Sequence, residues 1–146
     1  MPSFEYADSN RTLTAGLAGT VVVMLTFVLI FLYDRAASGA INSVLFRVTL
    51  LNVVVTIFLL SVASVNYWFL MEALRSDHPR AGVYLRRADG CFAASLILLL
   101  LEPVLILFTI QIYDVAEVAI GLWVVSILVL IFGWRDVLIG SKAMRR

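Results

Sequence analysis

The 146-residue sequence contains one cysteine, one histidine and only 14% charged residues. The single cysteine, Cys91, excludes a disulfide within the chain and the paired thiols of membrane redox enzymes. The single histidine, His78, excludes a haem held by two axial histidines of this chain, and neither residue can form a zinc site alone. A glycine-rich phosphate loop is also missing, as is a serine, histidine and aspartate set within the apolar stretches. We therefore expect no cofactor and no metal centre, and we do not expect the protein to be an enzyme.

Apolar residues dominate what is present. They make up 62% of the chain, and the mean hydropathy is +1.01. A soluble domain of this size cannot bury so much apolar surface in one core. A membrane-spanning helix needs roughly 20 largely apolar residues, and four stretches meet that length: 12–33, 48–71, 91–113 and 115–134. The sequence therefore predicts an all-α integral membrane protein whose single transmembrane domain, residues 1–146, is an antiparallel four-helix bundle.

Capping residues mark the ends of the second and third helices. Asn42 or Ser43 is suited to cap the second helix, whose pattern continues past the apolar stretch to residue 75. Ser76 or Asp77 can cap the third helix, with Pro79 in the first turn, where proline loses no hydrogen bond. These two helices are therefore expected to project beyond the membrane as a hairpin.

The fourth helix has its own start pattern. Asp114 is the expected N-cap, and Glu117 follows three residues later, as in a capping box. With these signals we predict helices over about 12–33, 44–75, 79–113 and 115–139.

The positive charges are distributed unevenly along the chain. With four spans, nine lysines and arginines fall on the side that carries both termini, and two fall on the opposite side. Because positively charged segments stay in the cytoplasm, we predict that both termini are cytoplasmic and that the protein lies in a plasma (inner) membrane. The nine are Arg11, Arg75, Arg80, Arg86, Arg87, Arg135, Lys142, Arg145 and Arg146, and the two are Arg35 and Arg47.

Three arginines lie between the second and third apolar stretches. We expect Arg80, Arg86 and Arg87 to contact anionic lipid head groups at the membrane surface. The chain has no soluble basic domain, so we expect the lipid bilayer, and not nucleic acid, to be the partner of these charges.

One carboxylate, Glu102, lies at the midpoint of the third apolar stretch, 91–113. An acid at the centre of a spanning helix costs roughly 2.5 to 3.5 kcal/mol to insert, so such residues usually face the bundle interior or a water-filled cavity. Thr20, Thr56 and Ser126 lie near the same depth and are candidate hydrogen-bond partners for the carboxyl group.

Polar side chains recur along one face of the second and third helices. At about 1.5 Å per residue, Asn66 and Ser95 are expected on the cytoplasmic side of Glu102, and Asn52 and Thr109 at a similar distance on the outer side. Facing each other, the two lines would place polar groups at three depths. On the third helix the line is Ser95, Glu102 and Thr109; on the second it is Thr49, Asn52, Thr56, Ala63 and Asn66.

Pro103 follows Glu102 directly. A proline inside a helix removes the hydrogen bond to the carbonyl four residues back, here Leu99, and tends to bend the helix. A free carbonyl and a carboxyl group close together supply oxygen ligands for a hard cation or a proton-carrying water. We therefore predict a hinge at Pro103 and an ion or proton site formed by Glu102, Thr56, Ser95, Thr109, Asn52 and Asn66.

A structural explanation stands beside this one. Polar residues within membranes often hold helices together, at about 0.6 kcal/mol per hydrogen bond. If Glu102 is bonded to Thr56 or Ser126, its role would be of this kind.

Three classes of function follow from these features. The leading hypothesis is a small homo-oligomeric ion channel, or a proton- or cation-coupled transporter, that uses Glu102. The alternative is an accessory or scaffold subunit of a larger membrane complex, which would dock through the small residues Ala15, Gly16, Gly19 and Thr20 and through the projecting hairpin. A lipid-modifying membrane enzyme is the weakest hypothesis, because Glu102 has no visible partner base, nucleophile or metal set.

Overall fold

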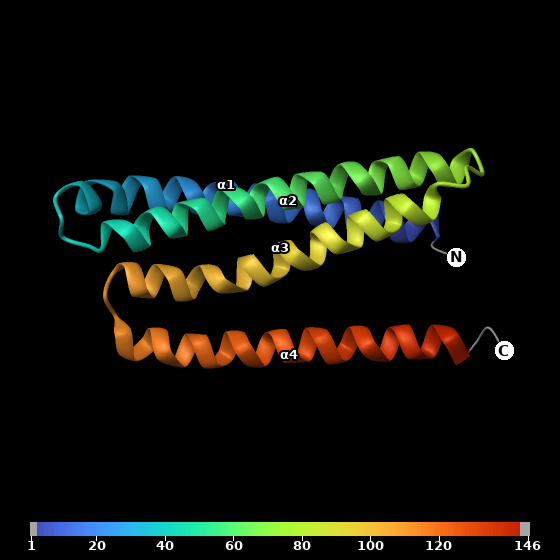
Figure 1. The fold of residues 1–146 in the computed structure, drawn as a ribbon. Coiled ribbons are helices and arrows are strands. Elements are labelled where there is room, and N and C mark those ends of the chain that lie inside the picture. The colour runs from blue at the N-terminus through green and yellow to red at the C-terminus, as the bar shows by residue number, and fades with distance from the viewer. Residues whose placement is uncertain (1–2, 144–146) are drawn as a thin grey trace.

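A computed structural model describes the backbone of residues 3–143 and the side chains of residues 3–132. It contains four long helices, α1 (Phe4–Ala37), α2 (Ser43–Arg75), α3 (Ala81–Thr109) and α4 (Tyr113–Ala143), packed antiparallel in chain order (Figure 1). Each carries an apolar segment long enough to cross a membrane. The predicted all-α, four-span architecture is therefore confirmed. The cations Arg135, Lys142, Arg145 and Arg146 lie outside the residues whose side chains are described.

The two ends of the bundle differ in character. Helix α1 begins and helix α4 ends at the same end as the α2–α3 connection, which we call the termini end (Figure 1). The opposite end, the loop end, carries the α1–α2 and α3–α4 connections. Helix α1 has 34 residues, about 50 Å at 1.5 Å per residue, whereas the hydrocarbon core of a bilayer is about 30 Å thick. The long helices therefore extend beyond the apolar layer.

Helices α1, α2 and α3 pack through side chains that recur every seven residues. The fully buried residues of α1 include Ala7, Thr14, Val21 and Val28, and those of α3 include Ala88, Ser95, Glu102 and Thr109. On α2 the buried positions alternate by three and four residues from Phe46 to Leu70. This is the seven-residue repeat of left-handed coiled-coil packing. Glu102 therefore occupies a core position of a three-helix bundle.

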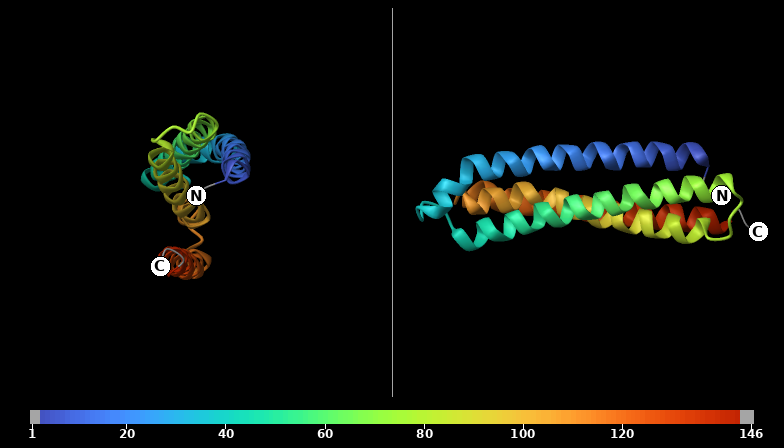
Figure 2. Two further views of the ribbon diagram at one scale, coloured as in Figure 1. Left: turned by 90° about the vertical axis from the view of Figure 1, so that its right-hand side faces the viewer. Right: turned by 90° about the horizontal axis from the view of Figure 1, so that it is seen from above.

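Helix α4 is set apart from this bundle. It packs along α3, and the end-on view in Figure 2 shows it away from α1 and α2. Among its described side chains only Ala116 is buried, and the indole Nε1 of Trp123 donates a hydrogen bond of 3.2 Å to the carbonyl of Ile97 on α3. Most of the apolar surface of α4 is thus left for lipid or for another protein.

The first helix begins eight residues earlier than predicted. The Ser3 side chain accepts a hydrogen bond from the backbone N–H of Tyr6 and caps α1 at Phe4. The segment expected to be a tail is helical because Ala7, with no exposed surface, packs with Tyr67 and Ala88 of the neighbouring helices. The termini end is therefore a three-helix projection and not a two-helix hairpin.

The caps of α2 and α3 follow the prediction in part. Asn42 caps α2, and its side chain accepts hydrogen bonds from the backbone N–H groups of Val44 and Leu45. The expected cap of α3 by Ser76 or Asp77 is wrong. Ser76 instead donates its hydroxyl to the Glu72 carbonyl, which closes α2, and α3 begins at Ala81, beyond the Pro79 turn.

The α3–α4 connection is longer than predicted, with three residues between the helices instead of one. Helix α3 ends at Thr109 rather than at residue 113, and Gln111 adopts a positive φ of 63°. Helix α4 then begins at Tyr113, so Asp114 lies in its first turn instead of capping it. A carboxylate there still opposes the positive end of the helix dipole.

Candidate functional site

The candidate site centres on Glu102, which has no exposed surface. It lies on α3 about 10 Å from the loop end of that helix, which closes at Thr109. The side-chain amide of Asn52 on α2 donates a hydrogen bond of 2.6 Å to Glu102 Oε1 and a second, of 3.0 Å, to the carbonyl of Leu98. One amide group thus holds the carboxyl group and the α3 backbone at the same point.

The second carboxyl oxygen, Glu102 Oε2, is different. It is a buried atom with no hydrogen-bond partner among the residues that the structure describes. Leaving a buried acceptor unsatisfied costs about 1 to 3 kcal/mol. The hydrogen bond from Asn52 therefore satisfies only one of the two carboxyl oxygens. The other, Oε2, has the capacity to take a proton or to bind a cation or a water molecule.

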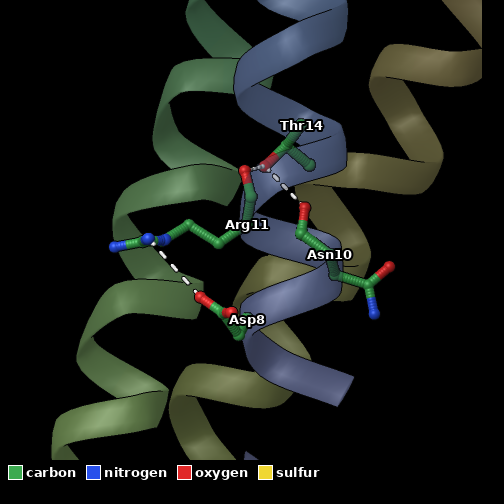
Figure 3. A network of polar contacts seen from close by, with 4 residues as sticks. All are labelled: Asp8, Asn10, Arg11 and Thr14. Atoms are coloured by element: carbon green, nitrogen blue, oxygen red, sulfur yellow. Dashed lines mark hydrogen bonds and ion pairs between the residues drawn. The ribbon is translucent and has the colours of Figure 1, made fainter. Parts of the chain in front are cut away.

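The other fully buried polar residues in the described part of the chain are satisfied by their own helices. Thr14 shows the pattern in Figure 3, where its hydroxyl donates to the carbonyls of Asn10 and Arg11, 2.9 Å from each, beside the exposed Asp8–Arg11 ion pair. The remaining four bond in the same way to carbonyls three or four residues back: Thr49, Thr56, Ser95 and Thr109. Only Glu102 in this group has a side-chain atom left over.

The structure brings together some of the predicted site residues and separates others. The span midpoints predicted that Asn52 lies at the depth of Thr109. In the structure Asn52 instead contacts Glu102 directly. It is Thr49 that meets Thr109, with their hydroxyls 3.0 Å apart. The polar residues of α2 therefore face different residues of α3 than predicted. The register between the two antiparallel helices cannot be inferred from the sequence of either helix alone.

Thr56, Ser95 and Asn66 do not bond to Glu102. Their donors go to carbonyls of their own helices, those of Asn52, Phe92 and Val62 respectively. Asn66 is only partly buried and is not one of the core positions of α2. Thr56 and Ser95 are buried positions of α2 and α3, while Asn52 is the direct partner of the carboxyl group.

The other two expected partners also bond within their own helices. Thr20 donates to the carbonyl of Gly16, and Ser126 donates to that of Leu122. Both lie on exposed parts of α1 and α4. The structural explanation that rested on Ser126 or Thr56 is therefore wrong in its partner, and Asn52 takes that place.

Pro103 lies inside α3, and the helix continues through it to Thr109. Its ring is exposed on the side of α3 away from the buried Glu102. Proline has no backbone N–H to give to the carbonyl of Leu99, so α3 is missing one internal hydrogen bond within a turn of the carboxyl group.

A second polar contact, which the sequence did not reveal, joins all three bundle helices near the termini end. Asp89 Oδ1 on α3 accepts hydrogen bonds from the hydroxyls of Tyr67 on α2 at 2.7 Å and Tyr6 on α1 at 3.3 Å. The two tyrosine rings meet edge to face, with centroids 6.4 Å apart. The regular spacing of Ala7 with Thr14 and Val21 was the available signal that α1 reaches this point.

The three arginines expected to contact lipid head groups are all exposed. Arg80, Arg86 and Arg87 lie at the termini end, at the start of α3 and just before it. The ion pairs between described side chains join other residues there, Arg11 with Asp8 and Arg75 with Glu72.

Comparison with known proteins gave no match, whether against protein-family models, curated proteins or solved structures. The functional argument therefore rests on the geometry around Glu102.

Proposed function

We propose that this protein is a small membrane transport protein in which Glu102 binds and releases a proton or a small cation. The observation that carries the proposal is the unpartnered Oε2 of a carboxyl group with no exposed surface. An intramembrane acid is expensive to insert and is typical of ion and proton pathways. A carboxyl group kept only for packing would be expected to have both oxygens hydrogen-bonded, just as each buried serine and threonine hydroxyl has a hydrogen-bond partner.

Access to Glu102 requires α2 and α3 to separate locally, because the carboxyl group lies between them. Pro103 supports this step, since the missing backbone bond at Leu99 lowers the cost of bending α3. Asn52 supports it as well. An amide that bonds both Glu102 and the Leu98 carbonyl can keep the backbone bond while the carboxyl group changes partner.

We propose a homo-oligomer because four helices barely enclose a pore, so that a pathway would lie between copies of the chain. The small residues Gly16 and Gly19 of α1 are exposed, and a Cβ atom added at either would meet nothing within 4 Å. Such a face allows a helix of a second copy to approach closely. The charge asymmetry supports cytoplasmic termini and a plasma (inner) membrane. We further propose that the protein is not an enzyme.

A flux assay in sealed liposomes tests the proposal. Purified protein is reconstituted at known density, dyes sensitive to H⁺, Na⁺ or K⁺ are trapped inside, and entry of each ion is followed in a gradient of that ion alone. We expect Glu102→Gln, which keeps an acceptor for Asn52 but cannot ionise, to reduce the flux at least tenfold. The matched control is Thr56→Val, which alters a buried hydroxyl on α2 that bonds only within its own helix.

Two outcomes would overturn the proposal. One is flux at the level of protein-free liposomes for the wild-type protein with every ion. The other is wild-type flux in the Glu102→Gln protein.

The second candidate function is an accessory subunit of a larger membrane complex. The specific observation in its favour is α4, which packs along α3 and leaves most of its described apolar side chains uncovered. Purification from native membranes in mild detergent discriminates the two. A different membrane protein retained in stoichiometric amount favours the accessory subunit, and a homo-oligomer favours transport.

A further inference from the structure

We propose that the groove between α3 and α4, together with Arg86, is a binding site for one anionic phospholipid. The proposal starts from a groove of about 170 Å³. The described residues that line it are all apolar, with four from α3 and two from α4: Phe92, Ala93, Leu96, Ile97, Leu130 and Ile131. A groove of this character within the spanning segments suits a hydrocarbon chain.

The α3 side of the groove continues toward the termini end along a helix face on which a glycine separates the groove from Arg86. Arg86, Gly90, Ala93 and Ile97 are spaced by four, three and four residues, which places them along one face of the helix. A Cβ atom added at Gly90 would meet nothing within 4 Å. The space between the arginine and the groove is therefore open, and a chain can lie close to the α3 backbone there.

Arg86 supplies the charge for a head group. Its side chain is exposed, and the ion pairs recorded among described side chains do not include it. The nearby carboxylate of Asp89 is engaged by the hydroxyls of Tyr6 and Tyr67. A guanidinium group in this position binds phosphate oxygens well, often through two hydrogen bonds.

The distances fit a phospholipid lying along the helix. Seven residues separate Arg86 from Ala93, which is about 10 Å along α3. The polar layer on each side of a bilayer is about 5 to 8 Å thick, and an arginine side chain extends toward the water. The head group therefore meets Arg86 at the depth where the acyl chain enters the groove.

The test uses Trp123, whose indole bonds to the carbonyl of the groove residue Ile97. Trp68 and Trp134 are replaced by phenylalanine, so that Trp123 is the only source of tryptophan fluorescence. The protein is placed in phosphatidylcholine nanodiscs, and increasing mole fractions of phosphatidylglycerol with brominated acyl chains are added. Bromine quenches tryptophan on contact, so quenching reports the occupied groove.

We expect saturable quenching at a lower mole fraction for brominated phosphatidylglycerol than for brominated phosphatidylcholine. Arg86→Gln should raise the half-quenching mole fraction about fivefold, the effect of one basic residue near a membrane surface. Arg75→Gln is the matched control, because Arg75 is an exposed arginine at the termini end that pairs with Glu72 on α2 and lies over the Phe4 ring of α1. It should change the half-quenching mole fraction less than twofold.

A second pair of variants tests the groove itself. Ala93→Leu fills the groove and should weaken quenching by both lipids, whereas Val23→Leu, on an exposed part of α1, should have no effect. Equal quenching by the two brominated lipids, or equal losses for Arg86→Gln and Arg75→Gln, would overturn the proposal. So would no quenching at any mole fraction, the result expected if a helix of a second copy fills the groove.

Discussion

Replacing Glu102 with leucine should make the folded protein more stable. The substitution removes Oε2, a buried acceptor without a partner, and so removes a cost of about 1 to 3 kcal/mol. It also removes the hydrogen bond from Asn52 to Oε1, which is worth about 0.6 kcal/mol between membrane helices. The Asn52 amide keeps its bond to the Leu98 carbonyl. The net expectation is a gain of about 0.5 to 2.5 kcal/mol in the free energy of unfolding.

Equilibrium unfolding in mixed micelles measures this change. The wild-type protein and Glu102→Leu are titrated with a denaturing detergent, and helix content is followed by circular dichroism. Thr56→Val is the matched control, because it also makes a buried polar site apolar but removes a side chain that is already satisfied. We expect it to change stability by less than 1 kcal/mol.

The sign of the result separates the two roles of Glu102. A residue kept for ion or proton binding costs stability, so its removal stabilises the fold while flux is lost. A loss of stability of 1 kcal/mol or more in Glu102→Leu would refute this reasoning. It would show that the carboxyl group mainly holds α2 and α3 together.

Two further predictions concern other parts of the bundle. Tyr67→Phe removes the 2.7 Å hydrogen bond to Asp89 from a fully buried ring and should lower the free energy of unfolding by about 1.5 to 3 kcal/mol. Tyr6→Phe removes a 3.3 Å bond and should lower it less in the same unfolding titration. Equal losses of stability in the two variants would contradict the difference in burial. Pro103→Ala restores a backbone donor inside α3 and should stabilise the protein by about 1 to 3 kcal/mol. Because α3 is then harder to bend, the ion flux should be slower. Unchanged flux in that variant would count against a hinge.

The fold was accessible from the sequence because length and hydropathy determine membrane spans almost alone. Four long apolar stretches separated by short polar connections leave few alternatives, and Asn42 marked the start of α2 correctly. Helix ends were harder to predict where tertiary packing overrides local signals. The start of α1 shows this, because Ala7 is helical through its burial against Tyr67 and Ala88.

The site was accessible in part. A carboxylate in an apolar stretch is visible in any sequence, and the seven-residue spacing of Ser95, Glu102 and Thr109 correctly identified one buried face of α3. The partner of Glu102 was not accessible. Choosing Asn52 over Thr56 requires the register between two antiparallel helices, which depends on packing along their whole length.

Asp89 was missed for a related reason. In the sequence it stands beside Arg86 and Arg87 and resembles an ordinary charged residue at the membrane surface. Its two tyrosine partners come from helices that are distant in the chain, and one of them lies in a segment that was expected to be a tail.

The carboxyl contacts of Asp89 and Glu102 both join α3 to α2. Tyr67 and Asn52 are about 22 Å apart along α2, and Asp89 and Glu102 are about 20 Å apart along α3. A rotation or slide of α3 against α2 near Asp89 is therefore expected to shift Glu102 relative to Asn52 as well, because both helices stay helical between the two contacts and α3 lacks only the backbone bond at Leu99. We therefore expect that a change in packing at the termini end would also change the distance between Glu102 and Asn52.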